Sequence, residues 1–195
     1  MADDKVITFA YTPEGHGGTF PFDPIRSPPL IGTYGLTTSV GVYLPLPDDR
    51  SFIAHINAGI KTKLDLKIYR LNFAESTAIK NAVHEQLTAH AKANDWSPQD
   101  VISTANANGS KRPYVMCPMY CIPSNPNQGI VDGIQHFLGS AGNVDLHINE
   151  HMVQGFYVEV RTGSVQTIEQ KWDLDWRGQR VESGVGVGDK EGLVV

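Results

Sequence analysis

A serine and a histidine, Ser39 and His55, are of the residue types from which a nucleophile and a general base are made. Ser39 opens an apolar stretch directly after a segment rich in glycine and threonine, and His55 lies in the next apolar stretch. If the two stretches are neighbouring strands, the hydroxyl and the imidazole come within hydrogen-bonding reach, as nucleophilic catalysis requires. The turn before Ser39 would then present backbone N–H groups to a developing oxyanion. The alternative is structural, with Ser39 an ordinary strand residue and His55 a half-buried histidine bonded to a carbonyl.

Two strands and a tight turn must position this pair. Residues 38–45 place apolar side chains on one face at period two, and residues 51–56 form a second strand. The Pro-Asp-Asp-Arg segment at 47–50 between them has turn chemistry. Such a hairpin folds the start of the first strand back against the end of the second. We therefore predict that the Ser39 hydroxyl and an imidazole nitrogen of His55 lie within about 4.5 Å of each other.

Residues 31–57 carry a resemblance to a known family. The pattern T-x-G-L-x-x-S-V, which runs from Thr33 to Val40, is similar to the T-x-G-L-G-S-C-V segment of the chemotaxis receptor glutamine deamidases (the CheD family). The A-H pair that ends at His55 stands where that family has Ala-His, and the cytotoxic necrotizing factor deamidases share the same Cys–His fold. The resemblance implies a catalytic site with the residue at position 39 as nucleophile, His55 as base and Thr33 assisting.

The nucleophile position departs from the family, because Ser39 stands where the family has cysteine. Thr37 and Thr38 replace Gly-Ser, and Asn57 follows where the family favours apolar residues. A serine hydroxyl has a far higher pKa than a thiol and depends more on its base. Three explanations stay open: a serine-using enzyme, an inactive relative, or an engineered replacement of cysteine by serine.

The function predicted from these residues is acyl transfer at an amide or ester carbonyl, of the deamidase or amidohydrolase type. One alternative is amide-bond formation in secondary metabolism, as in the tRNA-dependent cyclodipeptide synthases of fungi, although the acidic charge disfavours an aminoacyl-tRNA substrate. Another is a catalytically silent binding module on the same fold. We expect a peptide, amino-acid or small-molecule amide as substrate, with no cofactor and no metal.

Substrate binding is predicted at two irregular polar segments, residues 12–29 and 104–112, which we expect to border the site. Arg26 and Arg112 are the candidates for holding an anionic or carbonyl-rich substrate, and the alternative for both is a solvated surface charge. Thr37 and Thr38, beside the nucleophile, are further candidates for contact with the substrate.

The remaining pattern predicts an α+β fold, with a largely antiparallel sheet or two stacked sheets and two main flanking helices. Apolar residues recur every four positions in the longer helix. The expected helices span 73–94 and 128–138, and further strands span 64–71, 114–122, 144–148, 155–161 and 165–172. We expect one domain over residues 1–182 and a mobile glycine-rich tail over 183–195.

Composition excludes several classes of protein. The net charge is −5 with only 16 Lys and Arg residues, which disfavours a general nucleic-acid binder and binding to anionic membranes. No apolar run reaches the roughly 18 residues of a spanning helix. Two cysteines are too few for a disulfide-stapled secreted fold, so a reducing, cytoplasmic compartment is the default.

Two further groups of residues are candidate sites. Cys117 and Cys121 are predicted to be buried free thiols, with the alternative that one of them is the true nucleophile. Four alternating residues share one face of a predicted strand and form either a metal patch or the solvent face of an antiparallel strand: Asp145, His147, Asn149 and His151. The second interpretation is favoured.

Overall fold

The structure is a computed structural model, and it describes residues 9–22, 30–36, 39–57, 73–109, 111–117, 126–139, 145–148 and 153–169. Its elements follow in the order β1 (Ala10–Tyr11), β2 (His16–Phe20), β3 (Leu30–Tyr34), β4 (Ser39–Pro45), β5 (Ser51–Asn57), α1 (Phe73–Ala93), α2 (Pro98–Asn108), β6 (Tyr114–Cys117), α3 (Pro126–Leu138), β7 (Asp145–Ile148), β8 (Val153–Glu159) and β9 (Ser164–Glu169). The predicted strand at 64–71 and the predicted tail at 183–195 lie outside the described residues.

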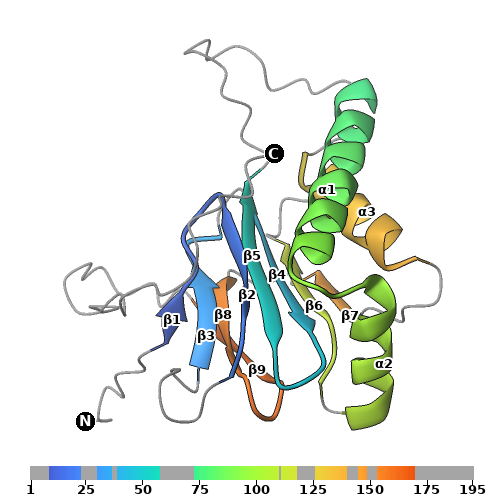
Figure 1. Cartoon of the computed structure of the whole chain (residues 1–195). Helices are drawn as coiled ribbons and strands as arrows, with labels where there is room; N and C mark the ends of the chain where they lie inside the picture. Colours follow the sequence, from blue (N-terminus) through green and yellow to red (C-terminus); the bar gives the residue numbers. More distant parts are fainter. Residues whose placement is uncertain are drawn as a thin grey trace, which may run out of the picture.

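The described elements form three layers, and this arrangement confirms the predicted α+β class. One sheet has the strand order β1-β3-β8-β9 and the other the order β2-β5-β4-β6-β7. Neighbouring strands are antiparallel, except that β1 runs parallel to β3 and β6 parallel to β7. The helices cover one face of the five-stranded sheet, and the four-stranded sheet lies against its other face (Figure 1).

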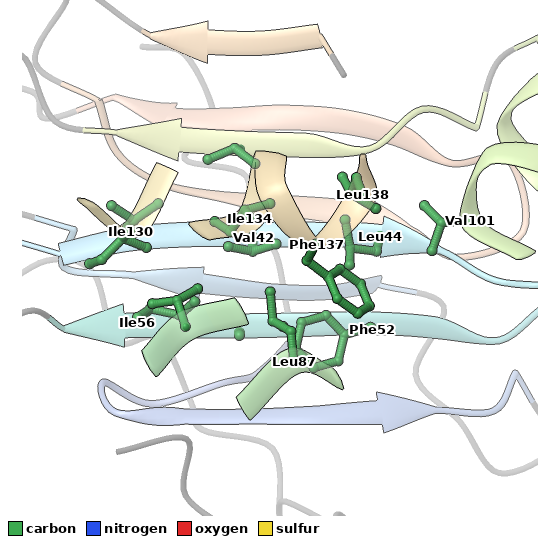
Figure 2. Close-up of a cluster of buried hydrophobic side chains, with 14 of the residues drawn as sticks. Val42, Leu44, Phe52, Ile56, Leu87, Val101, Ile130, Ile134, Phe137 and Leu138 are labelled. Atoms are coloured by element: carbon green, nitrogen blue, oxygen red, sulfur yellow. The ribbon is translucent and has the colours of Figure 1, made fainter. Parts of the chain in front are cut away.

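The core between the helices and the five-stranded sheet is a cluster of apolar side chains. Every second residue of β4 and β5 points toward the helices, as the alternation of side chains along a strand requires. Figure 2 shows Val42 and Ile56 from these strands against Leu87 of α1 and Ile134 of α3. The apolar stripe predicted on the helix at 73–94 is confirmed, because Leu87 and its neighbours on that stripe are buried.

A second core lies between the two sheets, where the intervening residues of β4 and β5 point. Tyr43 and Ile53 pack there against Phe156 and Val158 of β8. This layer also contains the buried polar side chains of Thr33, Ser39 and His55. Strands β4 and β5 are therefore buried on both faces, and of these two faces only the one toward the other sheet carries polar side chains.

The turn between β4 and β5 sets the register of the hairpin. Asp48 and Asp49 have φ angles of 58° and 54°. Positive φ at both central residues gives a turn whose twist matches that of the flanking strands, and aspartate tolerates this conformation. Arg50 N donates a hydrogen bond to Pro47 O at 3.1 Å. The predicted turn at 47–50 is thus confirmed, and its geometry fixes which residues of the two strands face each other.

Helix α2 (Pro98–Asn108) is an element that the sequence analysis missed. Its first turn carries a capping box, in which Asp100 N donates to Ser97 Oγ at 3.3 Å and Ser97 N donates to Asp100 Oδ2 at 2.8 Å. Proline at the first helical position, preceded by serine, is a recognised helix start. The segment 104–112 is therefore helical through Asn108, and the prediction that it is irregular throughout was wrong.

Candidate functional site

Three polar side chains from three strands meet between the two sheets. Ser39 is the first residue of β4, His55 lies on β5, and Thr33 reaches them from β3 of the opposite sheet. In the β4–β5 register Gly41 faces His55, so Ser39 and His55 are diagonal neighbours on one face. Ser39 Oγ lies 2.5 Å from His55 Nε2. The predicted proximity of these two groups is confirmed.

Thr33 determines the direction of every hydrogen bond in this group. Its hydroxyl donates its single proton to the carbonyl oxygen of Thr12 at 2.9 Å. Thr33 Oγ1 also lies 2.8 Å from His55 Nδ1, and with its proton already committed it must accept from that nitrogen. His55 therefore carries its proton on Nδ1. Nε2 has a free lone pair, and it accepts the hydrogen bond from the hydroxyl of Ser39.

The site is deeply buried, and burial determines its charge. Ser39 and His55 are each 1% exposed, and Thr33 is 0% exposed. Removal from water disfavours the imidazolium and lowers the pKa of His55 to about 4. Both hydrogen-bond partners of the ring are neutral hydroxyl groups. The imidazole is consequently neutral at physiological pH and is able to accept a proton, which is the state that a general base needs.

The chain crosses from one sheet to the other directly beside this group. Thr12 N donates to Gly32 O of the four-stranded sheet at 2.8 Å, and Gly15 N donates to His55 O of the five-stranded sheet at 2.8 Å. The crossover thus holds the backbone of the base and supplies the final acceptor of the hydrogen-bond chain. The prediction that the segment 12–29 borders the site is confirmed for its first residues, but residues 16–20 form strand β2 rather than a loop.

Thr12 is a site residue that the sequence analysis missed. Its backbone carbonyl accepts from Thr33, while its own hydroxyl is buried and has no hydrogen-bond partner among the described residues. An unsatisfied buried hydroxyl is uncommon and calls for a physical reason. No sequence signal identifies Thr12, because the contact that matters is made by a backbone carbonyl, which every residue has.

Arg112 does not lie beside Ser39 and His55, and its contact with substrate stays a prediction. Tyr43 faces Tyr114 in the antiparallel β4–β6 register, so Arg112 is level with the turn end of β4. Ser39 is at the opposite end, about 20 Å away for six residues of extended chain. Lys111 Nζ ties this segment to Asp49 Oδ1 of the turn at 2.7 Å.

The other predicted substrate-binding residues, Arg26, Thr37 and Thr38, lie outside the described residues. Their contacts with substrate remain predictions, and they rest on the positions of these residues in the sequence. Of the predicted site residues, the structure brings together Ser39 and His55 with Thr33.

The structure does not support the other two candidate sites, the metal patch at 145–151 and the cysteines. Residues 145–148 form β7, which is parallel to β6 and not part of an antiparallel pair, and Asn149 and His151 lie outside the described residues. Within the described residues no group of three or more His, Cys, Asp and Glu side chains comes together. Cys117 is buried as predicted, but it is disulfide-bonded rather than free. The Cys117 sulfur is therefore not an available nucleophile, and Cys121 lies outside the described residues.

No family model matches the chain, and no curated protein matches it significantly. Among the described helices, none is long and apolar enough to cross a membrane. The function is therefore inferred from the geometry around Ser39 and from the short resemblance of residues 31–57 to glutamine deamidases.

Proposed function

We propose that the protein is an acyl-transfer enzyme that acts on an amide or ester carbonyl, of the deamidase or amidohydrolase type. The observation that supports this most is the single direction of the hydrogen-bond chain from Ser39 through His55 and Thr33 to the Thr12 carbonyl. It leaves a neutral base with its lone pair aimed at the hydroxyl of a potential nucleophile. The order of Thr33, Ser39 and His55 in the sequence agrees with the resemblance to glutamine deamidases.

The reaction follows from this arrangement in two halves. Ser39 Oγ forms a bond to the substrate carbonyl carbon while its proton passes to His55 Nε2. The imidazolium returns that proton to the leaving nitrogen, the carbon–nitrogen bond breaks, and ammonia or an amine departs. Water then attacks the acyl group, with its proton taken by Nε2, and Ser39 recovers a proton as the acid leaves. An amine in place of water yields a new amide instead.

Thr33 has a positioning role in this scheme. Its hydroxyl holds the proton of His55 on Nδ1, and the alternative tautomer would place N–H toward Ser39 and remove the base. The hydrogen-bond chain ends on a carbonyl and not on a carboxylate, so among the described residues this chain supplies no full negative charge to stabilise the imidazolium. A thiol at position 39 suits such a site better than a hydroxyl, because sulfur requires less assistance from the base.

The first experiment compares the protein with Ser39→Cys and Ser39→Ala. Each is offered peptide glutamine and asparagine amides, with and without a primary amine, and ammonia release and mass shift are recorded. We expect Ser39→Cys to raise acyl transfer strongly if serine replaces a cysteine in this site. Turnover by the Ser39 protein that disappears in Ser39→Ala would instead show a native serine enzyme.

A catalytically silent binding module is the second candidate, and the deep burial of Ser39, His55 and Thr33 favours it. A satisfied polar group of this kind also specifies a unique packing between two sheets. A folded Ser39→Cys protein that resists iodoacetamide at neutral pH and releases no ammonia from any amide would favour this candidate over an enzyme.

A further inference from the structure

The space beside Ser39 and His55 is closed by apolar groups from the other sheet and from Leu36, which follows strand β3. Gly41 lies on the same face as Ser39 and faces His55 across the hairpin. A Cβ atom at Gly41 would lie 2.6 Å from Phe156 Cε1, 2.8 Å from Leu36 Cδ1 and 3.2 Å from the methyl carbon of Thr33. An aromatic edge and two methyl groups therefore converge on Gly41, a position next to Ser39 and His55 that has no side chain.

Of these three groups, the Leu36 side chain is the one that is free of the sheet hydrogen bonds and can move away from Gly41. Phe156 lies on β8, which is paired with β3 on one side and β9 on the other, and Thr33 lies within β3. Leu36 follows the end of β3 and belongs to neither ladder. It comes directly after Gly35, whose φ of 86° is a conformation that glycine adopts without strain. Movement of Leu36 therefore breaks no hydrogen bond of either sheet.

Some movement is required for the proposed function. Ser39 is 1% exposed and Leu36 is 2% exposed, so a substrate carbonyl does not reach Ser39 Oγ in the closed arrangement. The reacting carbon must come to about 3 Å from that oxygen. Its substituent then occupies the space above Gly41, where the Leu36 side chain now lies.

We propose that Leu36 fills the acyl-group subsite of the resting protein, and that the substrate is an amide or ester whose acyl side carries an aliphatic group of about the size of leucine. This inference rests on the proposed function and names its substrate class. An aliphatic acyl group replaces the contacts of Leu36 with Phe156, whereas an acetyl group leaves a void there. Methylene groups in such a pocket change selectivity by about 10-fold or more.

The accessibility of position 39 to a reagent in solution is tested with the Ser39→Cys protein, because alkylation of the introduced thiol requires no acyl transfer. In that background Leu36→Ala is compared with Leu44→Ala, which truncates an equally buried leucine on the helix side of the same sheet. We expect Leu36→Ala to accelerate alkylation by iodoacetamide about tenfold and Leu44→Ala to leave it unchanged. Leu36→Met, which keeps the volume of the side chain, serves if Leu36→Ala fails to fold, and we expect it to raise the rate less. Equal alkylation rates in the Leu36→Ala and Leu44→Ala proteins would overturn the proposal. So would equal alkylation rates in the Leu36→Met protein and the Ser39→Cys parent.

Substrate class is tested with the Ser39 protein and two nitrophenyl esters, the acetate and the 4-methylpentanoate, by nitrophenolate release and the mass of the acyl-protein. We expect a preference for the 4-methylpentanoate of about tenfold, abolished by Leu36→Phe. Acyl transfer with equal rates for both esters would overturn the Leu36 proposal and leave the proposed function standing. Alkylation that depends on Leu36, with no acyl-protein from either ester in the Ser39 or Ser39→Cys protein, would overturn the proposed function and keep Leu36 as the closing side chain.

Discussion

The two faces of the five-stranded sheet are both buried, but they are built from different kinds of residue. Toward the helices, β4 and β5 present only apolar side chains, among them Val42, Phe52 and Ile56. Toward the other sheet the same strands present Ser39 and His55 together with Tyr43, Ile53 and the bare backbone of Gly41. Adjacent residues of one strand therefore belong to layers with different compositions.

If the proposed function is correct, residues that determine stability and residues that carry out the reaction lie on opposite faces of the sheet. The helix-facing layer gains from the removal of apolar surface from water, which is non-directional and tolerates changes of shape. The layer between the sheets holds a hydrogen-bond chain that works only with each donor and acceptor in place. A substitution on the first face is expected to lower the free energy of unfolding, and one on the second to change acyl transfer and its pH dependence.

The largest expected effect lies on the polar face. Replacement of the base by His55→Gln keeps a polar side chain but removes the group that takes the proton from position 39. We expect acyl transfer to fall by about 10² to 10⁴-fold, the usual contribution of a general base. The rate of acyl-protein formation from an activated ester, measured by mass spectrometry in the Ser39 and Ser39→Cys backgrounds, checks this. Unchanged rates in both backgrounds would contradict a role for His55 as base.

On the apolar face we expect a substitution to lower stability and leave acyl transfer unchanged. Leu87→Ala removes a fully buried side chain of α1 that packs against the sheet. We expect the free energy of unfolding to fall by about 2–5 kcal/mol, from lost burial and the cavity left behind. Acyl transfer per folded molecule should stay the same. Urea denaturation followed by tryptophan fluorescence gives the first quantity, and rates corrected for the folded fraction give the second. A selective loss of rate would show that the two faces are not independent.

Much of this comparison was predictable, because the hairpin carries strong local signals. Alternation at period two and a Pro-Asp-Asp-Arg turn are enough to place Ser39 near His55. The elements that were missed lack such signals. Strand β2 begins His-Gly-Gly, and its pairing with β5 rather than any local pattern makes it a strand. Helix α2 is an exception, because its start does carry a local sequence signal: serine, then proline, with Asp100 as the capping partner. The prediction overlooked that signal.

The remaining differences concern long-range arrangement. Arg112 was expected at the site because its segment is polar, but the β4–β6 register carries it to the far end of the sheet. No local pattern in a single sequence reveals which strands become neighbours or in which direction they run. The role of the Thr12 carbonyl was equally hidden, since it depends on where the chain crosses between two sheets.

The pH dependence of stability tests the protonation state of His55. Burial lowers the pKa of His55 to about 4 from an ordinary value of 6.5, so between these two pH values the unfolded chain binds the extra proton. We expect the contribution of His55 to the free energy of unfolding to be full above pH 6.5 and to be lost as the pH drops toward 4, by about 3 kcal/mol at 1.36 kcal/mol per pKa unit. The acid limb of acyl transfer should likewise lie well below pH 6.5. Urea midpoints from pH 7 to 4 check the first expectation, and His55→Gln should lose this component. An identical pH dependence in both proteins would show that His55 does not titrate in this way.

The last comparison uses a matched pair of threonines on the polar face, one with a large expected effect and one with almost none. Thr33→Val preserves shape but removes a hydroxyl that makes two hydrogen bonds, leaving His55 Nδ1–H and the Thr12 carbonyl unsatisfied. We expect a loss of about 1–3 kcal/mol in the free energy of unfolding for each group left unpaired. Thr12→Val removes a buried hydroxyl that has no partner among the described residues.

Because no hydrogen bond of that hydroxyl is lost, Thr12→Val should be neutral or slightly stabilising. Urea denaturation of both variants, with acyl transfer and its pH profile measured beside it, checks the pair. Thr33→Val should also lower acyl transfer, since the imidazole is then free to carry its proton on Nε2, facing Ser39. Equal stability losses from the two substitutions would mean that the hydroxyl of Thr12 is satisfied in solution. A loss of acyl transfer in Thr12→Val at unchanged stability would place that hydroxyl in contact with the substrate, which would explain why the fold keeps it buried and unpaired.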